Sequence, residues 1–226
     1  MVGKSGASTP RSGGRPPARP LPRTARLNSS DDVLPTTLHE SLTARTVVLV
    51  EGISDKLALE RLAERRGRNL DMERVSIVPI GGSKNIGRFL DTFGPRGYDV
   101  RLAGLCDAAE ERDFRRALER AGFGSNVTRA DMERLGFYVC VADLEDELIR
   151  ALGAAAVERV VAAQGELGSF RIFQKQPAWQ DRTTEEQLRR FFGTYSGRKI
   201  QSAPLLVDAL DLNHVPRPLD RVLAHI

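Results

Sequence analysis

The sequence has no long run of apolar residues. None of its apolar segments approaches the roughly 18–20 residues that a membrane-spanning helix requires. The basic residues near the start are also not followed by the apolar segment that a secretory signal contains. A membrane protein and a secreted protein are both disfavoured, so we expect a cytoplasmic protein without a membrane partner.

Cysteine and histidine are scarce, with two cysteines and three histidines among 226 residues. Cys106 and Cys140 lie in apolar, strand-like runs, and neither has the spacing of a metal ligand. His39, His214 and His225 have no spacing partners either. These absences exclude a disulfide framework and a zinc site, and they predict two buried, reduced thiols.

The net charge of +4 is unevenly distributed along the chain. Of the 34 basic residues, six lie in residues 1–28, which leaves 28 basic against all 30 acidic residues in the remainder. The leader, residues 1–37, is also rich in Pro, Gly and Ser and is predicted to be disordered. It is either a weak, salt-dependent contact for a phosphate backbone or merely a solvated segment.

From about residue 38 onward, short apolar runs alternate with amphipathic helical patterns. Parallel strands are predicted at residues 47–50, 75–80, 101–106 and 137–141, with a helical pattern after each. Further helices are predicted at residues 154–164, 184–192 and 203–210. The alternation indicates an α/β fold with a central parallel sheet flanked by helices over residues 38–152. Residues 153–226 are predicted to form a helical C-terminal extension packed on it.

Acidic residues follow three of the predicted strands. Glu51 ends the first strand, Asp107 ends the third, and several acids lie at 143–146 after the fourth. Asp55 lies one turn into the first helix, which Ser54 is predicted to cap, so it could point back to the same edge. Ligands bind beyond the carboxyl ends of the strands in such a sheet. Each acid alone could instead be a helix cap or a solvated loop residue.

Convergent carboxylates without matching cations repel one another and raise one another's pKa values. A hard divalent cation relieves that repulsion, and Mg²⁺ prefers oxygen ligands together with several retained waters. The strand-end acids therefore predict a site for one or two Mg²⁺ or Mn²⁺ ions.

Three motifs resemble the TOPRIM domain, a module shared by topoisomerases, primases and several nucleases. "VVLVEGISDKLAL" resembles its first motif, a hydrophobic strand ending in Glu-Gly, and "VPIGGSKNIGRF" and "LAGLCDAAEE" resemble the next two. The form "VEGxSD" is most similar to the TOPRIM domains of the OLD (overcoming-lysogenization-defect) nucleases. The resemblance covers roughly residues 46–150.

The resemblance implies metal-dependent cleavage of DNA phosphodiester bonds. By position, Glu51 would be a metal ligand or general base, Asp55 and Asp107 would be ligands, and Glu145 would complete a second metal site. Lys199 resembles a lysine near the metals that stabilises the transition state. It is expected just before a helix, where a solvated loop lysine is the alternative.

One position departs from the pattern of this family. The second acid of its Asp-x-Asp motif is replaced by Ala109, which leaves Glu110 or Glu111 to substitute from the next helical turn. The sequence does not decide between the two glutamates. The departure puts the second metal in doubt more than the first.

Other residues have two interpretations. Gly82, Ser83 and Lys84 follow a predicted strand, where free backbone N–H groups could meet phosphate, but an ordinary strand-to-helix turn explains them equally well. Trp179 is favoured as a packing residue over a base-stacking one. The arginine-rich segments 61–68 and 112–120 are predicted to be solvated helix faces.

We expect a metal-dependent DNA nuclease. The alternatives are a nucleotidyl transferase, a small phosphate-ester hydrolase using the same metals, or a non-catalytic module that binds metal or nucleic acid. OLD nucleases carry an ATPase domain, whereas this sequence has no complete Gly-x-x-x-x-Gly-Lys-[Ser/Thr] motif. The resemblance thus predicts either a stand-alone nuclease or one with a separate ATPase partner. It leaves monomer and homodimer open.

Overall fold

The structure is a computed structural model that describes residues 43–226. The predicted disordered leader and His39 lie outside the described residues. The sheet contains β1 (Thr46–Val50), β2 (Val75–Pro79), β3 (Arg101–Cys106) and β4 (Phe137–Val139). All four strands are parallel, in the order β2-β1-β3-β4. The predicted α/β fold class is therefore confirmed.

Strand β1 is buried on both faces of the sheet. Val47 and Leu49 belong to the core on one face, and Val48 and Val50 belong to the core on the other. Every residue of β1 is buried, which explains its continuous β-branched sequence rather than an alternating one. The register pairs the end of β1 with the ends of β2 and β3, so the loops after these three strands meet at one edge of the sheet.

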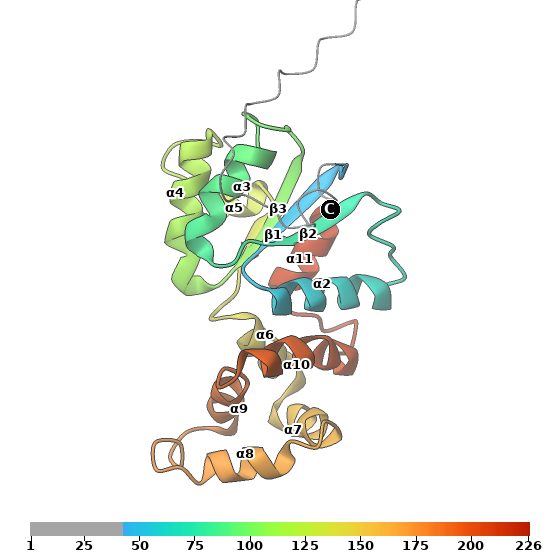
Figure 1. The fold of residues 1–226 in the computed structure, drawn as a ribbon, viewed down its shortest axis with the longest axis vertical. Coiled ribbons are helices and arrows are strands. Elements are labelled where there is room, and N and C mark those ends of the chain that lie inside the picture. The colour runs from blue at the N-terminus through green and yellow to red at the C-terminus, as the bar shows by residue number, and fades with distance from the viewer. Residues whose placement is uncertain (1–42) are drawn as a thin grey trace, which may run out of the picture. The chain divides into compact units, whose positions relative to one another are not determined.

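Each face of the sheet is covered by helices (Figure 1). One face carries η1 (Ser83–Asn85), α3 (Ile86–Phe93), η2 (Ala108–Glu110), α4 (Glu111–Ala121) and α5 (Arg129–Arg134). The other carries α2 (Ile53–Arg65) and the last helix, α11 (Arg217–His225), which returns from the C-terminal segment to lie against β3 and β4.

The remaining helices lie beyond the carboxyl ends of the strands, below the sheet in Figure 1. They are α6 (Leu144–Leu152), α7 (Ala154–Ala163), α8 (Leu167–Gln174), α9 (Thr184–Phe192) and α10 (Ser196–Ala209). Helix α10 packs along α2, where the Arg65 guanidinium donates to the carbonyl of Leu210 at 2.9 Å. This packing joins the C-terminal helices to the sheet.

Several predicted boundaries were wrong. The last predicted helix, 203–210, is the second half of α10, which begins at Ser196. Proline is disfavoured in a helix interior, but α10 continues through Pro204. Ser54 does not cap α2, because the helix begins at Ile53 and Gly52 is the cap residue. Strand β4 ends at Val139 rather than at residue 141.

The predictions for cysteine and tryptophan agree with the structure. Cys106 and Cys140 are buried and free, and burial raises the pKa of both thiols. Trp179 packs against the core and stacks on Phe173 with 5.4 Å between ring centroids. None of the helices in residues 43–226 combines the length and the apolar character needed to cross a membrane.

Candidate metal centre

Backbone hydrogen bonds fix the chain where the strands end. The N–H groups of Gly81 and Gly82, after β2, donate to the carbonyl of Glu51 at 3.0 and 3.3 Å. The N–H of Ala108, after β3, donates to the carbonyl of Ala142, after β4, at 3.1 Å. The acidic side chains that follow these strands therefore start from fixed positions along one edge of the sheet.

Glu51 lies beside Glu110 at this edge. The pKa of Glu51 is raised to about 8, first by burial, then by a hydrogen bond with the Glu110 carboxyl group and by the charge of Asp107. Oε2 of Glu51 and Oε2 of Glu110 are buried, and no other group of the described residues donates to either atom, so a hydrogen bond between the two carboxyls requires a proton held on one of them. These two side chains form an uncompensated acidic pair.

The structure distinguishes Glu110 from its neighbour Glu111. Glu111 accepts a hydrogen bond from Arg129 of α5 at 3.1 Å and lies 4.0 Å from Arg115 in an ion pair. Its charge is therefore used in holding α4 to α5. Glu110 instead lies beside Glu51 at the strand edge.

Asp55 is buried, at 8% exposure, and interacts both with the start of α2 and with the acidic edge. Its carboxylate accepts the N–H of Gly52 at 2.9 Å, which satisfies a donor at the start of α2. Burial and then the charge of Glu145 raise the pKa of Asp55 to about 6, against the lowering effect of the Gly52 hydrogen bond. The predicted return of Asp55 to the strand edge is thus observed.

Asp107 lies close enough to the other acidic groups for their charges to raise its pKa. Its pKa is raised to about 7 by burial and then by the charges of Asp55, Asp143, Glu145 and Glu110. These residues come from α2, the loop after β4, α6 and η2, so Asp107 lies among acids from four separate segments.

Lys199 brings a positive charge to the cluster from α10. Its ammonium group lies 2.8 Å from Oε2 of Glu145, whose other oxygen is buried without a donor among the described residues. Burial opposes the charge of Lys199, but Glu145, Asp143 and Asp107 raise its pKa overall. The expected position before a helix was wrong, since Lys199 lies in the first turn of α10.

The predicted phosphate-binding turn is only partly as expected. The N–H of Gly82 was expected to be free but donates to the carbonyl of Glu51. The Ser83 hydroxyl donates to Asp113 of α4 at 3.3 Å, whereas Lys84 is exposed. Gly81 and Gly82 have φ angles of 71° and 105°, which favour glycine, so the turn itself explains them. Phosphate binding by Ser83 and Lys84 stays a prediction.

Comparison with known proteins finds a family model that matches part of the chain. Residues 42–108 match the family model described as "Overcoming lysogenization defect protein-like, TOPRIM domain". The predicted resemblance to the OLD-like TOPRIM domain is confirmed. The comparison with curated proteins found no match.

Solved structures share the fold of the OLD-like TOPRIM domain and of the helices after it. The C-terminal region of the Xanthomonas campestris pv. campestris OLD protein matches with a TM-score of 0.66 and 22% identity, covering 83% of this chain and 94% of that one. The C-terminal region of the Burkholderia pseudomallei OLD protein matches with a TM-score of 0.64 and 19% identity, covering 80% and 96%. At these identities the likeness establishes the fold alone.

The acidic edge of the OLD-like TOPRIM domain fits a hydrated divalent cation. No three His, Cys, Asp or Glu side chains within residues 43–226 are arranged to hold an ion among themselves. Mg²⁺, however, usually keeps several waters and binds through one or two carboxylates. The paired oxygens of Glu51 and Glu110 suit that mode, with Asp107 beside them, and Asp55 and Glu145 supply further oxygen donors.

Arg189 is a residue of this region that the sequence did not indicate. It reaches from α9 to Asp143, with two nitrogens 2.8 and 2.7 Å from Oδ2. Asp143 also caps α6 by accepting the N–H of Asp146 at 2.8 Å. Because 46 residues separate Arg189 from Asp143, no local pattern could have revealed the pair.

Proposed function

We propose that this protein is a divalent-metal-dependent phosphodiesterase that cleaves DNA. The observation that carries the proposal is the set of buried carboxylate oxygens, on Glu51, Glu110 and Glu145, that receive no donor from the described residues. Leaving such groups without a partner costs about 1–3 kcal/mol each, or more when they are charged. The OLD-like TOPRIM domain implies a metal-dependent activity on phosphodiesters, in which these oxygens would bind the metal ion.

In this proposal Glu51 and Glu110 would bind the ion directly and Asp107 would hold one of its waters, while Asp55 and Glu145 would hold a second ion or orient its waters. A bound divalent ion supplies Lewis-acid stabilisation and a hydroxide nucleophile near neutral pH. Glu51 gives up its proton when the ion binds, and its carboxylate is then placed to orient the attacking water or to accept a proton from it. Lys199 stays protonated and would stabilise the charge that develops on the phosphate.

Nicking of supercoiled plasmid tests the proposal, with Mg²⁺, Mn²⁺ or EDTA. Glu51→Gln and Asp107→Asn are compared with Glu185→Gln and Asp181→Asn, which alter exposed acids on and just before α9. We expect metal-dependent nicking in the wild type and in both controls, and a loss of roughly 100-fold or more in both site variants. Nicking that persists in both site variants would exclude this site.

The products separate the proposed reaction from the other functions that the same site could serve. Nicked plasmid with free ends identifies hydrolysis, whereas a covalently joined nucleotide product identifies nucleotidyl transfer. Hydrolysis of bis(p-nitrophenyl) phosphate without any cleavage of DNA would make a small phosphate ester the substrate and would overturn the DNA assignment. A separate ATPase subunit, proposed from the resemblance, would raise the rate of nicking when added with ATP.

A further inference from the structure

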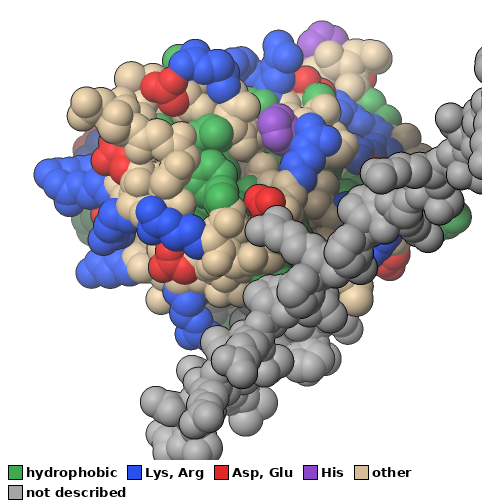
Figure 2. All heavy atoms as spheres, turned by 90° about the horizontal axis from the view of Figure 1, so that it is seen from above, with side chains coloured by type: hydrophobic (Ala, Val, Ile, Leu, Met, Phe, Trp, Pro, Cys, Tyr) green, Lys and Arg blue, Asp and Glu red, His purple; other side chains and the backbone are tan. Residues whose placement is uncertain are grey.

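Helices α3 and α4 carry exposed basic side chains that no intramolecular contact explains. We define the basic track as Lys84, Arg88, Arg112, Arg116 and Arg120. All five are exposed, and none of them forms an ion pair within residues 43–226. Figure 2 shows Lys and Arg side chains gathered along its left margin, the side on which Figure 1 draws α3 and α4.

The acidic residues of α4 form no ion pair with the basic track. Glu111 is bonded to Arg129, Asp113 to the hydroxyl of Ser83, and Glu119 to the N–H of Val127 at 2.8 Å. All three are only partly exposed and are turned to neighbouring segments. On these two helices the exposed acid is Asp91, at the far end of α3.

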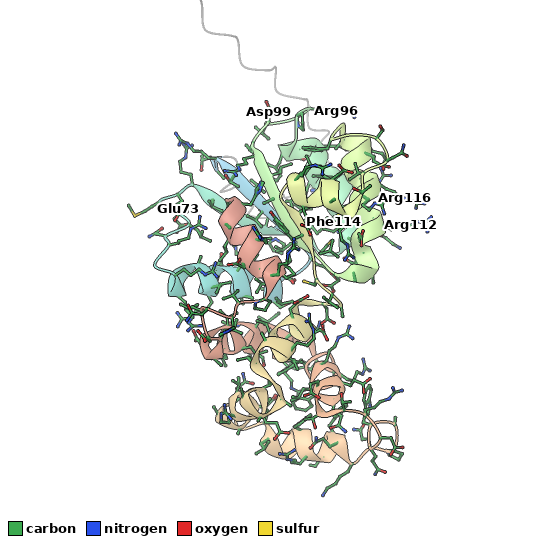
Figure 3. The ribbon with its side chains drawn as sticks, turned by 180° about the vertical axis from the view of Figure 1, so that it is seen from behind. Glu73, Arg96, Asp99, Arg112, Phe114 and Arg116 are labelled. Carbon is green, nitrogen blue, oxygen red and sulfur yellow. The ribbon has the colours of Figure 1, made fainter. Side chains whose placement is uncertain are left out.

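The arginines of α4 form one row on its outer side. Arg112, Arg116 and Arg120 are four residues apart, so they share a face and lie about 6 Å from one another along the axis. Figure 3 shows Arg112 and Arg116 projecting outward, while Phe114 between them points to the sheet and is fully buried. Like charges at this spacing destabilise a helix. A ligand of opposite charge would relieve this repulsion.

The basic track begins at the acidic edge. Helix α4 starts four residues after Asp107, and the Ser83–Asp113 hydrogen bond ties the turn before α3 to the first turn of α4. Lys84 and Arg112 are the direct neighbours of these two bonded residues in sequence, so both lie at the end of the track nearest the metal centre. From Arg112 to Arg120 the row then extends about 12 Å away along α4.

We infer that the basic track binds the phosphate backbone of the nucleic acid whose scissile phosphate lies at the acidic edge. The inference rests on the proposed function and extends it, because a row of about 12 Å passes several phosphates of a strand, which are spaced about 3.4 Å apart along the duplex axis. A small phosphate ester occupies only the acidic edge and gains nothing from this row. The substrate is therefore a polynucleotide, and its contact with α3 and α4 is independent of base sequence.

Binding of a fluorescent DNA duplex, followed by anisotropy in EDTA over a series of salt concentrations, tests the inference. The full chain carrying Arg112→Gln, Arg116→Gln and Arg120→Gln is compared with a chain carrying Arg159→Gln, Lys175→Gln and Arg221→Gln. The control residues are also exposed and form no ion pair in residues 43–226, so both variants lose three charges and keep the leader unchanged.

We expect the track variant to bind DNA roughly tenfold or more weakly at moderate salt. The slope of log affinity against log salt should fall by up to about 3, since each lost phosphate contact contributes about 0.9. The control variant should match the wild type. A duplex RNA should show the same loss, because the shared backbone is what is bound. Equal affinities of the two variants for DNA would overturn the inference. So would a track variant that binds polyglutamate, tested as an acidic competitor, more weakly than the wild type does but keeps its affinity for DNA.

Because DNA binding is measured in EDTA, its result does not depend on the proposed metal-dependent cleavage. If wild-type protein fails to nick plasmid but the track variant still loses affinity for DNA, the proposed catalysis is wrong and the track stands. If nicking is observed but both variants bind alike, the track is wrong and the nuclease stands. A single Arg116→Gln variant should lower the salt slope by about 0.9, a third of the fall expected for the triple variant, and equal thermal midpoints confirm that the variants are folded.

Discussion

At the scale of single residues, Glu110 and Glu111 have different roles although they are adjacent. Glu110 faces Glu51 without any donor of its own, whereas Glu111 is bound to Arg129. We expect Glu110→Gln to weaken Mn²⁺ binding about tenfold or more and to leave the free energy of unfolding nearly unchanged or raised. Glu111→Gln should leave Mn²⁺ affinity within twofold of wild type. Calorimetric titration of both variants checks this, and the reverse pattern would contradict the assignment.

Lys199 is the second residue whose environment makes a measurable prediction. Its removal leaves the buried carboxylate of Glu145 without its cation, so Lys199→Met should lower the free energy of unfolding by about 1–3 kcal/mol at pH 7.5 in urea. The exposed Lys175→Met is the matched control. In a Glu145→Gln background the same change should cost little, because the two residues are coupled. An equal cost in both backgrounds would show that the ion pair contributes nothing.

At the scale of elements, β3 depends on a close approach to its neighbours. A Cβ added at Gly104 would lie 2.5 Å from the ring of Phe137 on β4 and 2.9 Å from the carbonyl of Leu49 on β1. Gly104→Ala should therefore lower the free energy of unfolding by about 1–3 kcal/mol. Gly168→Ala in α8, where a Cβ meets nothing within 4 Å, should not destabilise. Thermal unfolding of the two variants checks this, and similar melting temperatures would contradict the packing.

The sequence predicted the sheet better than it predicted the C-terminal helices. Strand β3 was predicted at its observed bounds, because a buried parallel strand is a short apolar run with clear ends. Helices α5, α8 and α11 were missed. The predicted start of α10 was wrong, and the helix runs through Pro204, a residue that is disfavoured in a helix interior.

The candidate site was likewise foreseeable only where its residues follow a strand. Glu51, Asp55, Asp107 and Glu145 were named from position and resemblance, and the structure brings them to one edge. The bonds that depend on tertiary packing were not foreseeable. Lys199 was named from the resemblance, but its bond to Glu145, 54 residues away, depends on the packing of α10 against α6 and could not be read from the sequence.

At the scale of the whole molecule, the acidic edge makes the stability of the protein depend on pH. Burial and the neighbouring acids raise the pKa values of Glu51, Asp55 and Asp107 to about 8, 6 and 7 in the folded protein, whereas the same groups have pKa values near 4 in the unfolded chain. The folded state thus binds more protons between about pH 4 and 8, so its stability falls as the pH rises through this window. We expect a decrease of roughly 2–4 kcal/mol in EDTA, measured by urea unfolding.

Divalent cations should reverse this trend, because they bind the folded state and compete with the protons. Saturating Mg²⁺ should raise the melting temperature more at pH 8 than at pH 5.5. In Asp107→Asn the pH dependence in EDTA should become shallower, while Asp181→Asn should behave like the wild type. A stability that rises with pH in EDTA would show that the acids do not crowd one another in the folded protein.

The central claim is that the strand-end carboxylates of this OLD-like TOPRIM domain form a divalent-metal centre. Calorimetric titration of Mn²⁺ at pH 7.5 into wild type, Glu51→Gln and the control Glu185→Gln tests it most directly. We predict saturable binding in wild type and control, with release of protons, and at least a tenfold loss of affinity in Glu51→Gln. No saturable binding by the folded wild type, or equal binding by all three proteins, would contradict the claim.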